Sequence, residues 1–178
     1  MPPPLRYALM TLEHLCSAQC AEVYFDLDNE WVFVDWSGEL TLTAVQHTCL
    51  GIAYCFLGRC FPRVLNSNAN VSAVSWEVAQ WLSTEYLPAL RLTGVEQMAW
   101  VVPPSLRARN HILAAANLFP HVAIALFDDV ESAVSWLQQT APEPLQSGCA
   151  LPGRSYADEL KLRAIVDAFA QRLETSHS

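Results

Sequence analysis

Residues 97–102 have the sequence QMAWVV, and residues 122–127 have the sequence VAIALF. Both runs are nearly all apolar, which is typical of strands that are covered on both faces. Pro103 and Pro104 end the first run, and a helical pattern follows over about 105–118. Strands that alternate with helices predict parallel pairing. This stretch therefore favours an α/β fold, in which these two runs are the longest covered strands.

A hairpin is predicted near the start of the chain. Residues 23–25 are β-prone, residues 26–30 (DLDNE) have turn composition, and residues 31–36 (WVFVDW) alternate and are rich in strand formers. Apolar residues at spacings of three and four then predict a buried helix over 41–57. The hairpin adds antiparallel pairing, so the sheet is expected to be mixed.

The middle of the chain combines a polar segment with a helix start. We expect a short strand at 63–66, followed by a loop at 66–70, where the sequence is NSNAN. Ser75 is expected to be the N-cap of a helix over 76–92, which Pro88 kinks or shortens.

Charge and hydropathy exclude two classes of partner. The formal net charge is −8, with 10 basic and 18 acidic residues, and no Lys/Arg cluster is present to neutralise phosphates. No apolar run approaches the ~20 residues that a membrane-spanning helix needs, and the N-terminus lacks signal-peptide features. We therefore expect a cytoplasmic protein without nucleic-acid binding or membrane insertion.

Motifs for common chemistry are missing. There is no glycine-rich phosphate loop, no nucleophile elbow and no histidine pair at metal-ligand spacing. The six cysteines include no Cys-x-x-Cys and are interpreted as free thiols, mostly buried. The carboxylates of residues 26–35 are interpreted as a solvated hairpin tip. We expect no catalytic residue, no metal site and no cofactor.

Residues 64–106 read VLNSNANVSAVSWEVAQWLSTEYLPALRLTGVEQMAWVVPPSL, and residues 125–137 read ALFDDVESAVSWL. The order and spacing of these segments resemble the bacterial SpoIIAA-like family, which has a STAS-type fold. The resemblance covers about residues 22–139. Its closing segment is carried by Phe127, Asp128, Glu131, Ala133, Trp136 and Leu137.

The resemblance implies a fold and an organisation into segments. The fold class is α/β: a mixed sheet of about five strands, formed by the hairpin and parallel strands, with packed helices and an additional C-terminal helix. We expect an N-terminal extension at 1–20, a STAS-like domain at 21–139, a linker at 140–153, and a C-terminal helix and tail at 154–178.

One family feature is missing here. Anti-sigma-factor antagonists carry an Asp-Ser-Ser-Gly motif with a phosphorylatable serine at a helix start. Ser75 falls near that position, but its neighbours are Val74 and Trp76. This departure argues against switching by a kinase.

Function is predicted as a non-catalytic regulatory or binding module for a protein partner or small ligand in the bacterial cytoplasm. Two alternatives stay open: a carrier of a lipid or small apolar ligand, and an enzyme with an unrecognised site near residues 66–76. Ligands of α/β sheets bind beyond the carboxyl ends of parallel strands, and helix N-termini attract anions. The candidate binding residues are therefore Asn66, Ser67, Asn68, Asn70, Ser75 and Trp76.

The C-terminal helix carries an apolar seam that something must cover. It is formed by Leu162, Val166, Phe169 and Leu173. Either it packs on its own domain or it pairs with a second chain. We expect the second arrangement, a homodimer, because the resemblance implies a STAS-like domain that is complete without this helix.

Overall fold

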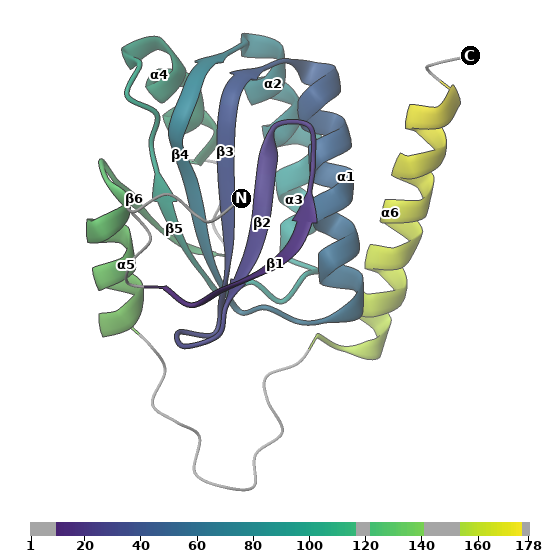
Figure 1. The fold of residues 1–178 in the computed structure, drawn as a ribbon. Coiled ribbons are helices and arrows are strands. Elements are labelled where there is room, and N and C mark those ends of the chain that lie inside the picture. Colours follow the sequence, from purple (N-terminus) through teal and green to yellow (C-terminus); the bar gives the residue numbers. More distant parts are fainter. Residues whose placement is uncertain (1–9, 117–121, 141–153, 176–178) are drawn as a thin grey trace, which may run out of the picture.

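The computed structural model describes residues 10–116, 122–140 and 154–175. Its centre is a six-stranded sheet with the order β1-β2-β3-β4-β5-β6 (Figure 1). The strands β1, β2 and β3 pair antiparallel, and β3 to β6 pair parallel. Their bounds are Leu12–Ser17, Ala21–Asp26, Trp31–Leu40, Arg63–Val74, Gln97–Val101 and Ala123–Phe127. The mixed α/β sheet is therefore confirmed, with six strands where about five were expected.

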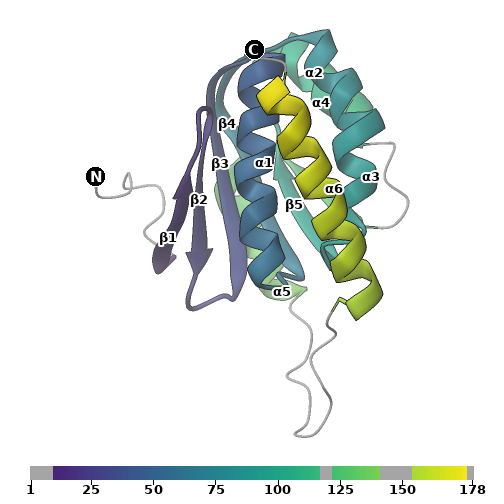
Figure 2. The same ribbon diagram turned by 90° about the vertical axis from the view of Figure 1, so that its right-hand side faces the viewer.

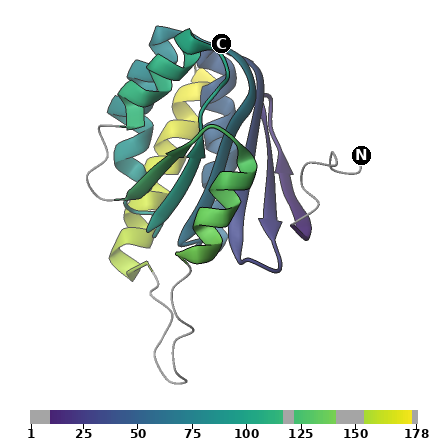
Figure 3. The same cartoon turned by 90° about the vertical axis from the view of Figure 1, so that its left-hand side faces the viewer.

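Helices cover both faces of this sheet. One face carries α1, α4 and a helical segment that consists of α2, a π-helical turn and α3, whereas α5 covers the other face (Figure 3). The C-terminal helix α6 lies outside α1 and forms a further layer (Figure 2). The bounds of α1 to α6 are Leu42–Gly58, Trp76–Trp81, Leu87–Leu90, Leu106–Ala116, Val130–Gln139 and Tyr156–Thr175. None of the described helices is long and apolar enough to cross a membrane.

The hairpin and the first helix form as the sequence predicted. The buried Asp26 carboxylate accepts the backbone N–H groups of Asp28 and Asn29 at 3.0 and 3.2 Å, which closes the β2–β3 turn. This carboxylate is thus part of the turn structure rather than of a solvated tip. Thr41 caps α1, since its Oγ1 accepts the backbone N–H of Ala44 at 3.4 Å.

Strand β1 was not predicted. It lies within residues 1–20, which were expected to be an extension outside the domain, and it forms the edge of the sheet beside β2. A register shift between His14 and Cys16 interrupts the pairing. Such a bulge breaks the alternation of period two by which a strand is found in a sequence.

The prediction that residues 97–102 and 122–127 form the longest covered strands was wrong. The longest strands are β4, with 12 residues, and β3, with 10. Strand β6 is an edge strand, and its Leu126 is exposed. Ile124 packs against the core on the α1 side and Phe127 against the core on the α5 side, but both are only partly buried, so the apolar sequence does not reflect full burial on both faces.

The helix after Ser75 changes its hydrogen-bonding pattern before Pro88. Residues Leu82–Tyr86 form a π-helical turn, in which the Leu87 N–H bonds to the Leu82 carbonyl. Pro88 has no N–H to donate to the carbonyl of residue 84, and its ring crowds that carbonyl. The wider turn relieves this crowding, so the predicted interruption occurs one turn earlier than the proline itself.

Candidate functional site

The predicted loop at 66–70 is wrong, because these residues lie inside β4. Asn66 and Ser67 are paired in register with β3 on one side and with β5 on the other, and Asn70 is paired with β3. Asparagine has low β propensity, but a central strand with partners on both sides overrides that preference.

The strand separates the candidate binding residues. Asn66 and Asn68 face the α1 side and line a cavity there. Ser67 is fully buried, and its Oγ accepts the backbone N–H of Ala69 at 3.4 Å. The Asn70 amide donates to the Asp35 carboxylate at 3.4 Å. The four residues therefore do not form one site.

Ser75 and Trp76 lie at the far end of β4, roughly 20 Å along the strand from Asn68. The Ser75 Oγ accepts the backbone N–H of Val78 at 3.4 Å, which confirms the helix cap. Trp76 is 60% exposed and packs edge-on against His111, with the ring centroids 5.6 Å apart. His111 in turn contacts the Val74 carbonyl through Nδ1 at 3.0 Å. This pair is a surface feature, separate from the cavity.

The cavity near Asn66, called here the inner cavity, lies between the sheet and the helices of the α1 side. About 60 Å³ of it is open to the centres of water-sized molecules. One water occupies roughly 10–15 Å³ on this measure, so the space matches a molecule of about five non-hydrogen atoms. Its walls are apolar apart from a few amide, indole and phenol groups. The lining includes Trp36, Phe56, Asn66, Asn68, Tyr86, Leu90 and Trp100.

The polar groups of the inner cavity are oriented by their neighbours. The Trp36 indole N–H donates to Asn66 Oδ1 at 2.9 Å, so the Asn66 NH₂ group faces away from Trp36. The Asn68 NH₂ group donates to the Val101 carbonyl at 3.2 Å. Trp100 is paired in register with Asn66, and its buried indole N–H has no acceptor among the described residues. Leaving such a donor without a partner costs about 1–3 kcal/mol.

The cavity offers little for proton transfer. No Asp, Glu, His, Lys or Arg is among its described lining residues. Burial raises the pKa of Tyr86 well above its ordinary value, as do the charge and hydrogen bond of the neighbouring Cys49 thiol. Burial likewise raises the pKa of Cys49. Both groups are therefore neutral at physiological pH, and the site is suited to binding an uncharged molecule.

The seam of α6 packs on its own chain. Leu162, Val166 and Leu173 are buried, and Phe169 stacks on Trp81 with a centroid distance of 5.6 Å. This is the first of the two arrangements considered for the seam. A homodimer stays a prediction, but the seam could join a second copy only if α6 left its present position.

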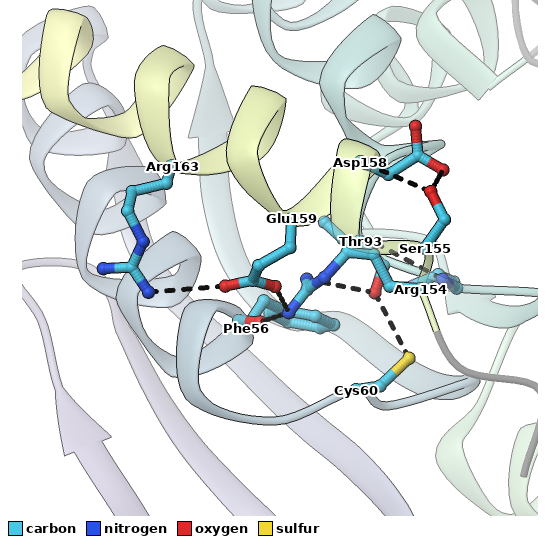
Figure 4. Close-up of polar contacts among 9 residues, drawn as sticks. Phe56, Cys60, Thr93, Arg154, Ser155, Asp158, Glu159 and Arg163 are labelled. Carbon is cyan, nitrogen blue, oxygen red and sulfur yellow. Dashed lines mark hydrogen bonds and ion pairs between the residues drawn. The ribbon is translucent and has the colours of Figure 1, made fainter.

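A buried arginine fixes the start of α6 (Figure 4). The Arg154 guanidinium donates to the Phe56 carbonyl at the end of α1 at 2.7 Å and lies 2.5 Å from the Glu159 carboxylate. Glu159 also accepts from Arg163 at 3.4 Å. Ser155 accepts the Asp158 backbone N–H at 3.1 Å and so begins the helix.

The cysteines are free wherever the structure describes them. Cys20 and Cys49 are buried, and Cys16, Cys55 and Cys60 are half-buried. Within the described ranges, no group of three His, Cys, Asp or Glu residues could hold a metal ion. Cys149 lies outside the described residues.

Comparison with known proteins adds one structural likeness. No protein-family model matches the chain, and no curated protein matches it. A search of solved structures finds an uncharacterised protein of the DUF3478 family with a SpoIIAA-like fold, from Shewanella loihica PV-4. The match has 16% identity and a TM-score of 0.46, and it covers 72% of this chain and 93% of that one. A likeness at this identity concerns the fold alone.

Sequence reasoning missed Trp100 and Tyr86 as site residues. Trp100 lies in residues 97–102, which were predicted only as a covered apolar strand. One signal was available in the sequence. A buried Trp N–H ordinarily finds a hydrogen-bond partner, and the amide groups of the strand beside Trp100 could provide one. Without the register between β4 and β5, nothing placed the two together.

Proposed function

We propose that this protein is a non-catalytic binding module that takes up a small, uncharged, largely apolar ligand in the inner cavity, in the bacterial cytoplasm. The ligand contributes a hydrogen-bond acceptor, such as a hydroxyl or carbonyl oxygen. The observation that carries this proposal is the buried indole N–H of Trp100, which has no acceptor among the described residues and belongs to a side chain that lines the cavity together with Asn66.

Two further features support ligand binding over catalysis. The part of the cavity wall that the structure describes contains no Asp, Glu, His, Lys or Arg. A π-helical turn forms part of the wall through Leu82 and Tyr86, and such turns occur frequently at functional sites. The alternative of an enzyme near residues 66–76 has less support, because the polar side chains of that segment lie on different faces of β4.

The test is a titration of ¹⁵N-labelled protein with 1-butanol, a probe with five non-hydrogen atoms. The indole N–H resonance of Trp100 should shift saturably. Trp100→Phe keeps a ring and removes the donor, so it should weaken binding about tenfold, the worth of one hydrogen bond. Trp76→Phe is the matched control and should leave the affinity unchanged. A Trp100 resonance that does not move up to the solubility limit would refute the proposal.

A protein partner is the second candidate function. The observation in its favour is Trp76, a large aromatic side chain that is 60% exposed at the start of α2. Exposed tryptophans are frequent anchors of protein interfaces. Trp76→Ser should abolish capture of a specific partner in a pull-down, while Leu126→Ser, a change at another exposed apolar residue, should not. Equal capture by both variants would remove this candidate.

A further inference from the structure

A second cavity lies directly outside the inner one. This outer cavity has about 80 Å³ open to the centres of water-sized molecules. It is bounded by α1 at Ala53, by the aromatic ring of Trp81, and by α6 at Leu162, Val166 and Phe169. On the measure used above it has room for about six non-hydrogen atoms.

One layer of side chains separates the two cavities. Phe56, Tyr86 and Leu90 line both of them. Tyr86 belongs to the π-helical turn, which is wider than an α-helical turn. The wall is therefore formed partly by a residue of an irregular helical turn.

The outer cavity also borders an open groove between α3 and α6. Glu85, Ala89, Ile165 and Arg172 line both the groove and the outer cavity. The Arg172–Glu85 ion pair that lies there is 3.7 Å long and half-exposed, so it holds α6 weakly. Arg154, by contrast, fixes the other end of α6 firmly. A route to solvent thus leads past the C-terminal half of α6.

We infer that the two cavities form a single elongated site for one unbranched alkyl chain with an uncharged polar head. The inference rests on the proposed function and extends it. The head accepts the Trp100 N–H in the inner cavity, and the tail passes Tyr86 and ends beneath α6. The summed space fits about ten to twelve non-hydrogen atoms.

The head is uncharged because nothing in the inner cavity would neutralise it. No cationic side chain is among its described lining residues. An ionised carboxylate buried without a partner is strongly unfavourable. A long-chain alcohol therefore binds better than the carboxylate of the same length.

The experiment uses the full chain and a series of 1-alkanols from butanol to dodecanol, each below its aggregation limit. Each added methylene should lower the Kd about fourfold, because one buried CH₂ contributes ~0.8 kcal/mol. The gain should stop near decanol, when the two cavities are full. Decanoate at neutral pH should bind more than tenfold more weakly than decanol.

Ala53→Phe separates the two proposals. Ala53 lines the outer cavity but not the inner one, so this variant should lose the chain-length gain and keep the wild-type affinity for butanol. Butanol binding also reports that the variant is folded. Ala53→Leu is a second variant, whose smaller side chain fills less of the outer cavity. Ala164→Phe, at an exposed position of α6, is the matched control and should behave as wild type.

Each outcome bears on one proposal. A Kd that does not depend on chain length, or an unchanged chain-length gain in Ala53→Phe, would overturn the elongated site while butanol binding still supports the inner one. Decanoate that binds as tightly as decanol would overturn the uncharged head. Failure of butanol itself to bind would overturn the proposed function instead.

Discussion

Arg154→Met tests how α6 is held on the domain. The Arg154 side chain is only 6% exposed and connects three parts of the chain: the end of α1 through Phe56, the turn before β5 through Thr93, and α6 through Glu159 (Figure 4). Methionine keeps the length and apolar stem of the side chain. The change therefore removes the guanidinium contacts and little else.

The contacts of the Arg154 guanidinium determine how much free energy the substitution costs. The bond to the Phe56 carbonyl at 2.7 Å is charge-assisted and contributes about 1.5–3 kcal/mol, whereas the bond to Thr93 at 3.5 Å is long and adds little. Breaking a buried ion pair costs about 3–5 kcal/mol when the remaining charge has no partner. Glu159 is 25% exposed and keeps Arg163, so the lower end applies. We expect a loss of about 3 kcal/mol in the free energy that docks α6.

Hydrogen exchange and urea denaturation measure this loss. The amides of α6 should exchange roughly a hundredfold faster in Arg154→Met than in the wild type. Arg163→Met is the matched control: it bonds the same carboxylate at 3.4 Å but is 55% exposed, so it should cost less than about 0.5 kcal/mol. Equal effects of the two variants would show that burial of Arg154 does not hold the helix, and the reasoning would fail.

Three further outcomes are expected. Burial raises the pKa of Cys55 to about 12 and raises that of Cys49 as well, whereas the unfolded thiols titrate near 9. As the pH rises, the unfolded chain therefore loses these protons first, so the urea midpoint should be steady below pH 9 and fall above pH 9. A midpoint that rises between pH 9 and 11 would contradict this expectation. Ser75→Ala should lower the free energy of unfolding by ~1 kcal/mol and Ser75→Asp should restore it, as measured by urea denaturation. Val166→Asp should loosen the packing of α6 on its own chain, and the sedimentation coefficient of the variant should equal that of the wild type. If the wild type sediments as a dimer and the variant as a monomer, the seam is instead an interface between two copies.

Local signals predicted much of the fold. Turn residues and alternation located the hairpin, and spacings of three and four located α1 and α6, since each pattern is contained within one element. Asp129 caps α5 by accepting the Ser132 N–H at 2.7 Å, a local contact of the same kind.

The errors arise where a neighbour in space decides the structure. Strand β1 is an edge strand with a bulge, and its pairing with β2 is invisible in its own six residues. The apolar run in β6 suggested burial on both faces, but strand order places it at an edge. The seam of α6 was identified correctly as apolar, whereas its covering by Trp81 and α1 depends on tertiary packing that the linker sequence does not encode.

Strand β4 shows why the candidate site was only half predictable. Polar residues at 66–70 suggested a loop because asparagine disfavours strands. Their position in a central strand conflicts with this local preference, and natural sequences show such conflicts mainly where function or packing requires them. The amides of Asn66 and Asn68 are held in a central strand by the Trp36 N–H and the Val101 carbonyl. A loop would present these groups to water, where they bind weakly. A strand between β3 and β5 presents Asn66 to an apolar cavity that Trp100 also lines, where a hydrogen bond is stronger than in water because water competes less.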